Sequence, residues 1–99
     1  MTRYRVVLWR EIPALVEAFE GDRTVRTPLS QRFHDLIDTL AMRTGASSSE
    51  AYLEGWRHGV EAERPGSAES VARQVVAELE AGFERLLQQY LLNLSSRPE

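Results

Sequence analysis

The chain has 99 residues, the size of one domain with a modest core, and its 42% hydrophobic and 27% charged residues exclude a disordered composition. It contains no cysteine, which excludes disulfides and thiolate metal sites and favours a reducing, cytoplasmic setting. A formal net charge of −3 disfavours nucleic-acid binding, and no apolar run approaches the roughly 20 residues that span a bilayer. We therefore expect residues 1–99 to form one cytoplasmic domain that binds no membrane.

The first third of the chain has the pattern of antiparallel strands. Residues 4–9 are rich in β-branched and aromatic side chains and are short enough for one strand. Segments 15–20 and 23–27 flank a Gly-Asp pair at 21–22, which is a two-residue hairpin signal. Pro13 is expected to interrupt any longer ladder, because it has no N–H to donate. This pattern predicts a small antiparallel sheet of about three strands.

The rest of the chain has mainly helical spacing. Apolar residues recur at the 3.6-residue period over 29–44, 48–58 and 67–93, which predicts three helices. Ser67 is placed to cap the last helix, and Gly82 is its one weak point, at a cost of about 1 kcal/mol against alanine. Together with the sheet, these helices predict an α+β fold of two layers.

Two segments keep more than one interpretation. Residues 60–64 are predicted as an extended connector or a short edge strand. Near the end of the last predicted helix, apolar residues such as Leu86, Leu87 and Tyr90 occur on more than one side. This excess indicates either a surface for a partner or self-association through the C-terminal helix, or else a core covered by the sheet and first helix.

Several separated blocks occur in a distinctive order: YRVVLWREIPA at 4–14, AMR at 41–43, AYLE and WR within 51–57, then GS, VA and ELE within 66–80. This order resembles a small bacterial family called virulence factor, whose domain also occurs at the end of conserved virulence factor C proteins. The resemblance implies a cytoplasmic accessory protein of a larger assembly, with no established catalytic residues. It also points to larger enzymes of one-carbon metabolism as protein partners.

A second resemblance, to ribbon-helix-helix DNA-binding modules, gives an alternative function. In such modules a strand from each of two chains enters the major groove; here Thr24 and Arg26 would read bases and the helix start near Ser47 would hold phosphate. Pro28 at the end of the strand, the long β-segment before it and the negative net charge argue against this alternative.

One group of aromatic and arginine residues is the candidate interface. It consists of Trp9, Arg10, Tyr52, Trp56 and Arg57, and such side chains are enriched in interface hot spots. If the first strand runs under the second helix, the two tryptophans can meet. The simpler interpretation is core packing, with Arg57 lying over the rings.

One further group is a candidate anion site. Arg64, Gly66 and Ser67 precede the last predicted helix, where free N–H groups and the helix dipole attract anions. The simpler interpretation is a turn followed by a serine cap. The two histidines, His34 and His58, lie in separate predicted elements, so we expect no catalytic group, metal site or cofactor. The leading prediction is a non-enzymatic protein-interaction module.

Overall fold

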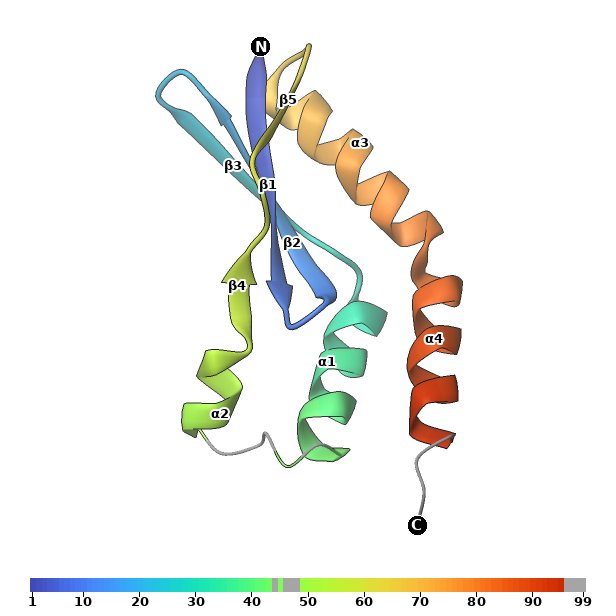
Figure 1. Cartoon of the computed structure of the whole chain (residues 1–99). Helices are drawn as coiled ribbons and strands as arrows, with labels where there is room; N and C mark the ends of the chain where they lie inside the picture. The colour runs from blue at the N-terminus through green and yellow to red at the C-terminus, as the bar shows by residue number, and fades with distance from the viewer. Residues whose placement is uncertain (44, 46–48, 96–99) are drawn as a thin grey trace.

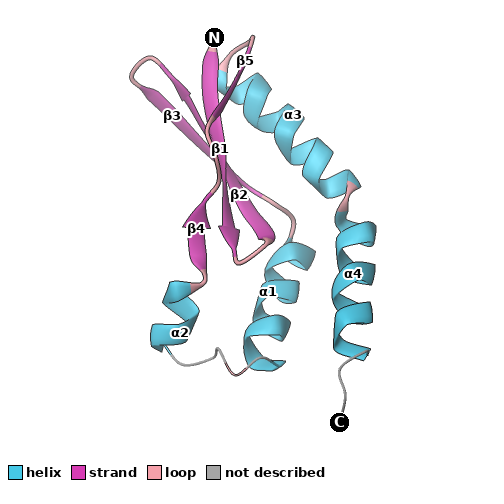
Figure 2. Cartoon of the chain, in the orientation of Figure 1, coloured by secondary structure: helices cyan, strands magenta, loops and turns pink. Residues whose placement is uncertain are grey.

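The computed structural model describes residues 1–43, 45 and 49–95. Over these residues the chain has an α+β fold, in which helices pack against an antiparallel sheet (Figure 1, Figure 2). The elements in chain order are β1 (Thr2–Trp9), β2 (Ile12–Glu20), β3 (Arg23–Pro28), α1 (Gln31–Arg43), α2 (Ser49–Glu54), β4 (Trp56–His58), β5 (Ala62–Arg64), α3 (Ala68–Ala81) and α4 (Phe83–Ser95). The predicted class is confirmed, but these described residues form five strands and four helices instead of three of each.

The sheet is built around β1. Its strand order is β3-β2-β1-β4, and β5 also pairs with β1. A tight turn joins β1 to β2, and Gly21, with φ at 58°, joins β2 to β3 as the hairpin signal predicts. On its other edge β1 accepts β4 beside residues 7–9 and β5 beside residues 2–4. The edge-strand interpretation of 60–64 is therefore confirmed.

The start of β2 differs from the prediction. The strand begins at Ile12 and continues through Pro13, which lies opposite Leu8. The register shifts between Val7 and Leu8, so the ladder is irregular where the proline lies. A bulge of this kind tolerates a residue that lacks an N–H donor.

The predicted helix over 48–58 is wrong in its second half. Helix α2 ends at Glu54, and the following residues form β4, in which Trp56 lies opposite Trp9 of β1. Tyr52 and Trp56 have helical spacing in the sequence, but Tyr52 packs on Trp9 from α2 and Trp56 packs on Tyr52 from β4. Residues 44 and 48, which bound two of the predicted helices, lie outside the described residues.

The predicted single helix over 67–93 is also wrong, because it divides at Gly82. Gly82 ends α3 with its N–H donating to the carbonyls of Leu79 and Glu80, and α4 starts at once in another direction (Figure 1). The division lets α3 follow the sheet while α4 packs on α1, where the rings of Phe33 and Phe83 meet edge-on at 4.8 Å. A straight rod could not follow both surfaces.

The core has two parts. One lies between the sheet and α3, and its buried members are Val16, Ala18, Ala68, Val71, Ala72 and Val75. The other lies among the lower end of the sheet, α1 and α4, and its large members are Trp9, Ile12, Phe33, Leu36, Ile37, Leu40 and Phe83.

The predicted apolar excess at the end of the last helix is partly used by this second core. Leu86, Leu87 and Tyr90 are half-buried and pack against it. The side chains of residues 91–95 are not among those described, so self-association through this helix stays a prediction.

Candidate functional site

The five candidate interface residues lie together where the β1–β2 turn meets the junction of α2 and β4. The Trp9 ring lies 5.9 Å from that of Tyr52, which in turn lies 5.9 Å from that of Trp56. Trp9 is fully buried, and its Nε1 donates to the carbonyl of Tyr52 at 2.8 Å. Trp9 is therefore a core residue that fixes the site, while Arg10 and Arg57 are exposed.

Gly55 makes this junction possible. A Cβ atom at this position would lie 2.4 Å from Nε1 of Trp9, so any side chain here would force the indole to move. The carbonyl of Gly55 accepts a hydrogen bond of 2.7 Å from the N–H of Arg10. The turn between β1 and β2 is thereby held directly against the end of α2.

Arg10 has an unusual backbone conformation. Its φ is 56°, and it is the one non-glycine residue with positive φ in the described part of the chain. Two-residue hairpins usually place glycine, asparagine or aspartate at such positions, because a Cβ atom is strained there. Residues with strained backbone conformations are frequent at functional sites. The guanidinium of Arg10 lies 4.7 Å over the ring of Trp9.

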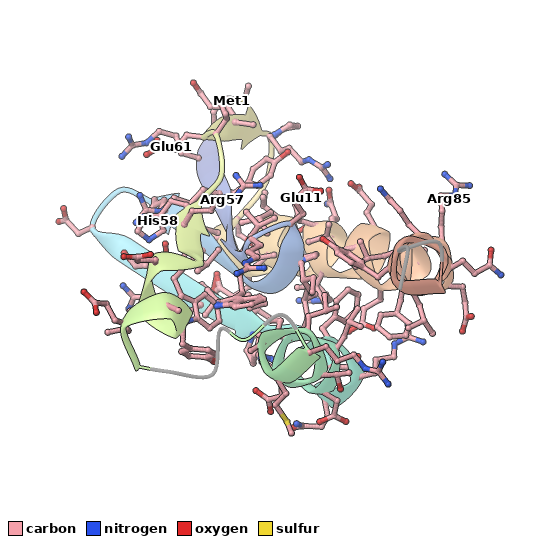
Figure 3. All side chains as sticks on the ribbon, turned by 60° about the horizontal axis from the view of Figure 1, so that its bottom comes forward. Met1, Glu11, Arg57, His58, Glu61 and Arg85 are labelled. Atoms are coloured by element: carbon pink, nitrogen blue, oxygen red, sulfur yellow. The ribbon has the colours of Figure 1, made fainter. Side chains whose placement is uncertain are left out.

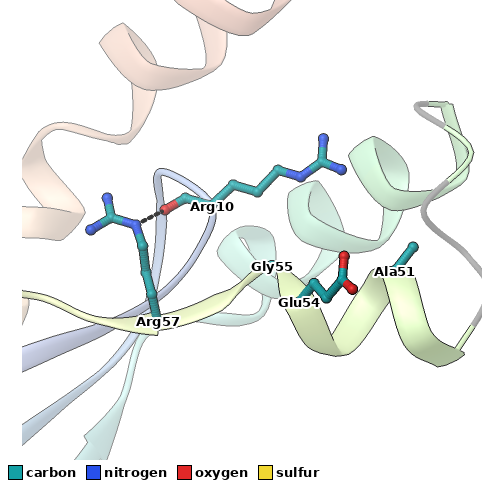
Figure 4. Close-up of a pocket in the computed structure, with 5 residues that line it drawn as sticks. All are labelled: Arg10, Ala51, Glu54, Gly55 and Arg57. Carbon is teal, nitrogen blue, oxygen red and sulfur yellow. Dashed lines mark hydrogen bonds between the residues drawn. The ribbon is translucent and has the colours of Figure 1, made fainter.

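Arg57 is bound to the same turn. Its Nε donates to the carbonyl of Arg10 at 2.6 Å, and Figure 4 shows the two guanidinium groups directed to opposite sides of this bond. The terminal nitrogens of Arg57 have no hydrogen-bond partner among the residues that the structure describes. The bond through Nε thus orients the cation and leaves its outer edge available to a ligand.

A pocket of about 360 Å³ lies between these elements. It is lined by Arg10, Ala51, Glu54, Gly55 and Arg57 (Figure 4). Two cations and one carboxylate give the pocket an excess of positive charge. Such an arrangement can bind an acidic or polar group, with the backbone of Gly55 contributing part of the wall.

Two residues near the pocket, Glu11 and Tyr90, are not predicted from the sequence to belong to this site. Burial raises the pKa of Tyr90, the charge of Glu11 raises it further, and the charges of Arg10 and Arg57 oppose this shift. Tyr90 of α4 is therefore within electrostatic reach of the turn that carries Arg10 and Glu11. The sequence places Tyr90 on an apolar helix face, but nothing in its pattern places that helix beside this turn.

At the candidate anion site the polar groups have partners within the chain. Both terminal nitrogens of Arg64 bind the carboxylate of Glu78, at 2.6 and 2.7 Å. The Ser67 hydroxyl accepts a hydrogen bond from the N–H of residue 70, and the carbonyl of Gly66 accepts one from the hydroxyl of residue 2. At the start of α3, the N–H of Ala68 donates a hydrogen bond to the carboxylate of Glu20, which belongs to the same chain.

The residues of the DNA-binding alternative lie on β3. Thr24 and Arg26 face the same side of the sheet, and β3 pairs with β2 of the same chain. The Nε of Arg26 donates to the carboxylate of Glu17 at 2.7 Å. Ser47 lies outside the described residues.

Other kinds of site were sought over the same part of the chain. No three histidine, aspartate or glutamate side chains within residues 1–43, 45 and 49–95 gather as metal ligands would. Within these ranges, no helix combines the length and the apolar character that a bilayer crossing requires.

Comparison with known proteins identifies the family. A family model described as virulence factor matches residues 7–89, which is most of the chain and includes every candidate site residue. Neither the curated proteins nor the solved structures contain a significant match. The matched segment contains the β1–β2 turn, the α2–β4 junction and α3 in one continuous alignment, and on this match the chain belongs to the virulence factor family.

Proposed function

We propose that this protein is a non-enzymatic interaction module that docks onto a larger protein through the Arg10–Arg57 pocket. The observation that carries the proposal is Arg10: a strained turn position, where glycine would cost less, holds an arginine over a buried tryptophan. Its backbone carbonyl in turn orients Arg57. Two exposed arginines, Arg10 of the β1–β2 turn and Arg57 of β4, therefore line one pocket.

The surroundings of the pocket are those of a binding surface. Trp9, Tyr52 and Trp56 form a packed aromatic base, so little conformational entropy would be lost on docking. Arginine beside aromatic rings is the combination found most often in interface hot spots. The positive pocket fits an acidic side chain in a partner's loop, with Leu53, which is 67% exposed on the adjacent helix, as an apolar contact.

The partner that we propose is a larger bacterial enzyme, in keeping with the accessory role that the family resemblance implies and with its pointer to one-carbon metabolism. A chain without cysteine suits a reducing cytoplasm, where we place the complex. The protein then contributes binding and positioning, and the partner contributes the chemistry.

In the test, the wild-type protein first captures its partner from an extract of the native host. The binding of each variant to the purified partner is then measured. The double variant R10A/R57A removes both cations, and R85A is the matched control, because Arg85 projects from α4 away from the pocket (Figure 3). We expect the wild-type protein and R85A to bind the same partner equally, and R10A/R57A to bind at least about tenfold more weakly. Circular dichroism establishes that each variant is folded.

Three outcomes would contradict the proposal. The first is that no protein binds the wild type with a measurable Kd, and the second is that R10A/R57A binds as tightly as R85A. The third is that duplex DNA shifts at low salt and is released as salt rises, which would favour the ribbon-helix-helix regulator. That result would also require a dimer formed through residues 24–27.

A further inference from the structure

The two faces of the sheet are covered differently. Val16 and Ala18 of β2 face α3, whereas Glu17 points to the opposite face, because successive side chains in a strand alternate. In Figure 2, α3 lies along one side of the upper sheet, and α1 and α2 lie at its lower end. Glu17 is nevertheless only 4% exposed. Other side chains of the sheet itself must cover it.

Two arginines cover this carboxylate. Arg5 of β1 and Arg26 of β3 lie directly opposite Glu17 in the two ladders, so the three residues form a row across neighbouring strands. Each arginine donates through Nε to a different oxygen of Glu17, and both distances are 2.7 Å. The carboxylate therefore holds one edge of each guanidinium and fixes its orientation.

The other edge of each guanidinium remains available. The terminal nitrogens of Arg5 and Arg26 meet no hydrogen-bond acceptor in the part of the chain that the structure describes. The side chain of Arg5 is 27% exposed and that of Arg26 is 66% exposed, so these nitrogens can reach solvent. Two oriented forks on the surface form a ready arrangement for oxyanions.

The row extends to a third arginine. The Phe19 ring lies next to Glu17 on this face, with the guanidinium of Arg5 5.4 Å from its centroid and that of Arg3 5.9 Å away. Arg3 also forms an ion pair of 3.4 Å with Glu61. We call Arg3, Arg5, Arg26, Glu17 and Phe19 the arginine face.

We propose that the arginine face binds an acidic peptide segment of a partner protein, with the segment's carboxylates held by the terminal nitrogens of Arg5 and Arg26. The row of Arg5, Glu17 and Arg26 has two cations against one buried carboxylate, whereas Arg3 on the same face is balanced by Glu61 and lies opposite Glu63. The charge of this row is thus complementary to an acidic ligand.

The geometry favours an extended peptide. Arg3 and Arg5 are two residues apart on one strand, at about 6.8 Å, which is also the repeat of same-side side chains in an extended ligand. The half-buried Phe19 lies between them as an apolar contact for the ligand's stems.

The probe is a fluorescently labelled peptide of alternating glutamate and serine, compared by anisotropy with its glutamine counterpart and with a single-stranded oligothymidylate of equal charge. Replacing Arg5 by alanine would leave Glu17 buried with one partner fewer and would change stability as well as binding. The informative variant is R5K/R26K, because each lysine can still neutralise Glu17 but cannot present a second set of donors. R85K is the matched control.

We expect the wild-type protein, R85K and R10A/R57A to bind the glutamate peptide with similar Kd, and R5K/R26K to bind at least about tenfold more weakly while unfolding at the same temperature. Amide shifts on β1 to β3 should follow the titration. The inference is overturned if R5K/R26K binds as well as the wild type, if the glutamine peptide binds equally, if no peptide binds at low salt, or if the oligothymidylate binds more tightly. Because R10A/R57A keeps the arginine face, its result separates this site from the Arg10–Arg57 pocket.

Discussion

Residues 16 and 17 of β2 are neighbours in the chain and are both buried, but by different physical means. Val16 is fully buried in a cluster of aliphatic side chains under α3. Glu17 is 4% exposed beneath two arginines on a face that no described helix covers along its length. Burial in this sheet therefore indicates an apolar core on one side and an ion-pair network on the other.

The two kinds of burial have different consequences for stability. Burying the valine contributes about 1.5–3 kcal/mol and depends little on pH. For the carboxylate, desolvation offsets most of the attraction, so the net contribution of the ion pairs is small. Burial raises the pKa of Glu17, but the hydrogen bonds and charges of Arg5 and Arg26 outweigh it and hold the pKa below its ordinary value. Glu17 is thus ionised at neutral pH.

The largest expected effect comes from moving the carboxylate to the other face. Val16→Glu would bury a charge beside Val71 and Val75 without a guanidinium. We expect it to lower the free energy of unfolding by more than about 4 kcal/mol, measured by urea denaturation. Val16→Ala, which creates only a cavity, should cost about 2 kcal/mol. If the free energy of unfolding of Val16→Glu lay within about 1 kcal/mol of the wild-type value, as for an ordinary surface substitution, the two faces would not be distinct.

A smaller effect is expected where the carboxylate lies naturally. Glu17→Gln keeps the shape but removes the charge between the arginines, and we expect a loss of roughly 2 kcal/mol at pH 7 by the same measurement. Glu80→Gln is a useful comparison, because Glu80 also pairs with an arginine, Arg32, at 3.0 Å, but its side chain is 25% exposed beside the start of α1, where it also accepts from Ser30. A larger loss for Glu80→Gln would contradict the special role of burial at residue 17.

The pH dependence separates the two faces further. The folded-state pKa of Glu17 lies below its ordinary value of 4.5, so its ionised form stabilises the fold above that pH. This contribution is lost as the pH falls through the folded-state pKa. We expect the wild type to lose stability below about pH 5. Glu17→Gln should lose less, while Val16→Ala should follow the wild-type slope, as measured by urea titration at several pH values.

Part of the acid sensitivity will remain in Glu17→Gln. The pKa values of Glu69, Glu78 and Glu80 are also below their ordinary value, and these carboxylates still take up protons as the pH falls. An unchanged slope in Glu17→Gln would mean that these groups, and not the arginine face, determine acid unfolding.

The smallest effects distinguish the two arginines that cover Glu17. Arg5 is the less exposed, so Arg5→Gln should cost about 1 kcal/mol. Arg26 is mostly in solvent, and Arg26→Gln should cost less than about 0.5 kcal/mol, since water screens its charge. Thermal unfolding of both variants measures which loss of stability is larger. A larger loss for Arg26→Gln would mean that β3, and not β1, mainly shields Glu17 from solvent.

The sequence predicts those parts of the fold in which local chemistry decides the structure. Gly21 turns the β2–β3 hairpin and Ser67 caps α3 as predicted, because both signals act within a few residues. The candidate interface is also brought together, since Trp9 and Trp56 are opposite one another in the sheet. The turn and the cap need no information about distant contacts, whereas the pairing of Trp9 with Trp56 depends on β4 joining β1.

The errors arise where distant contacts decide. Gly82 weakens an isolated helix by only about 1 kcal/mol, and the different partners of α3 and α4 turn this weak point into a break. Residues 56–58, which are predicted as the end of a helix, form β4 because they pair with the second edge of β1. No local pattern at Trp56 indicates this pairing. The burial of Glu17 is not predicted from the sequence, because an acidic residue in a strand is ordinarily exposed. Its burial depends on the register of β2 with two other strands.

The central place of β1 has a consequence for how the chain folds during synthesis. Residues 2–28 contain β1, β2 and β3, which pair through short turns and can form as soon as they leave the ribosome. The second edge of β1 must wait for residues 56–64, so the nascent protein exposes an unpaired strand while some thirty further residues are made. That interval is when the edge of β1 is open to pairing with other chains, and a chaperone that shields it would act only then.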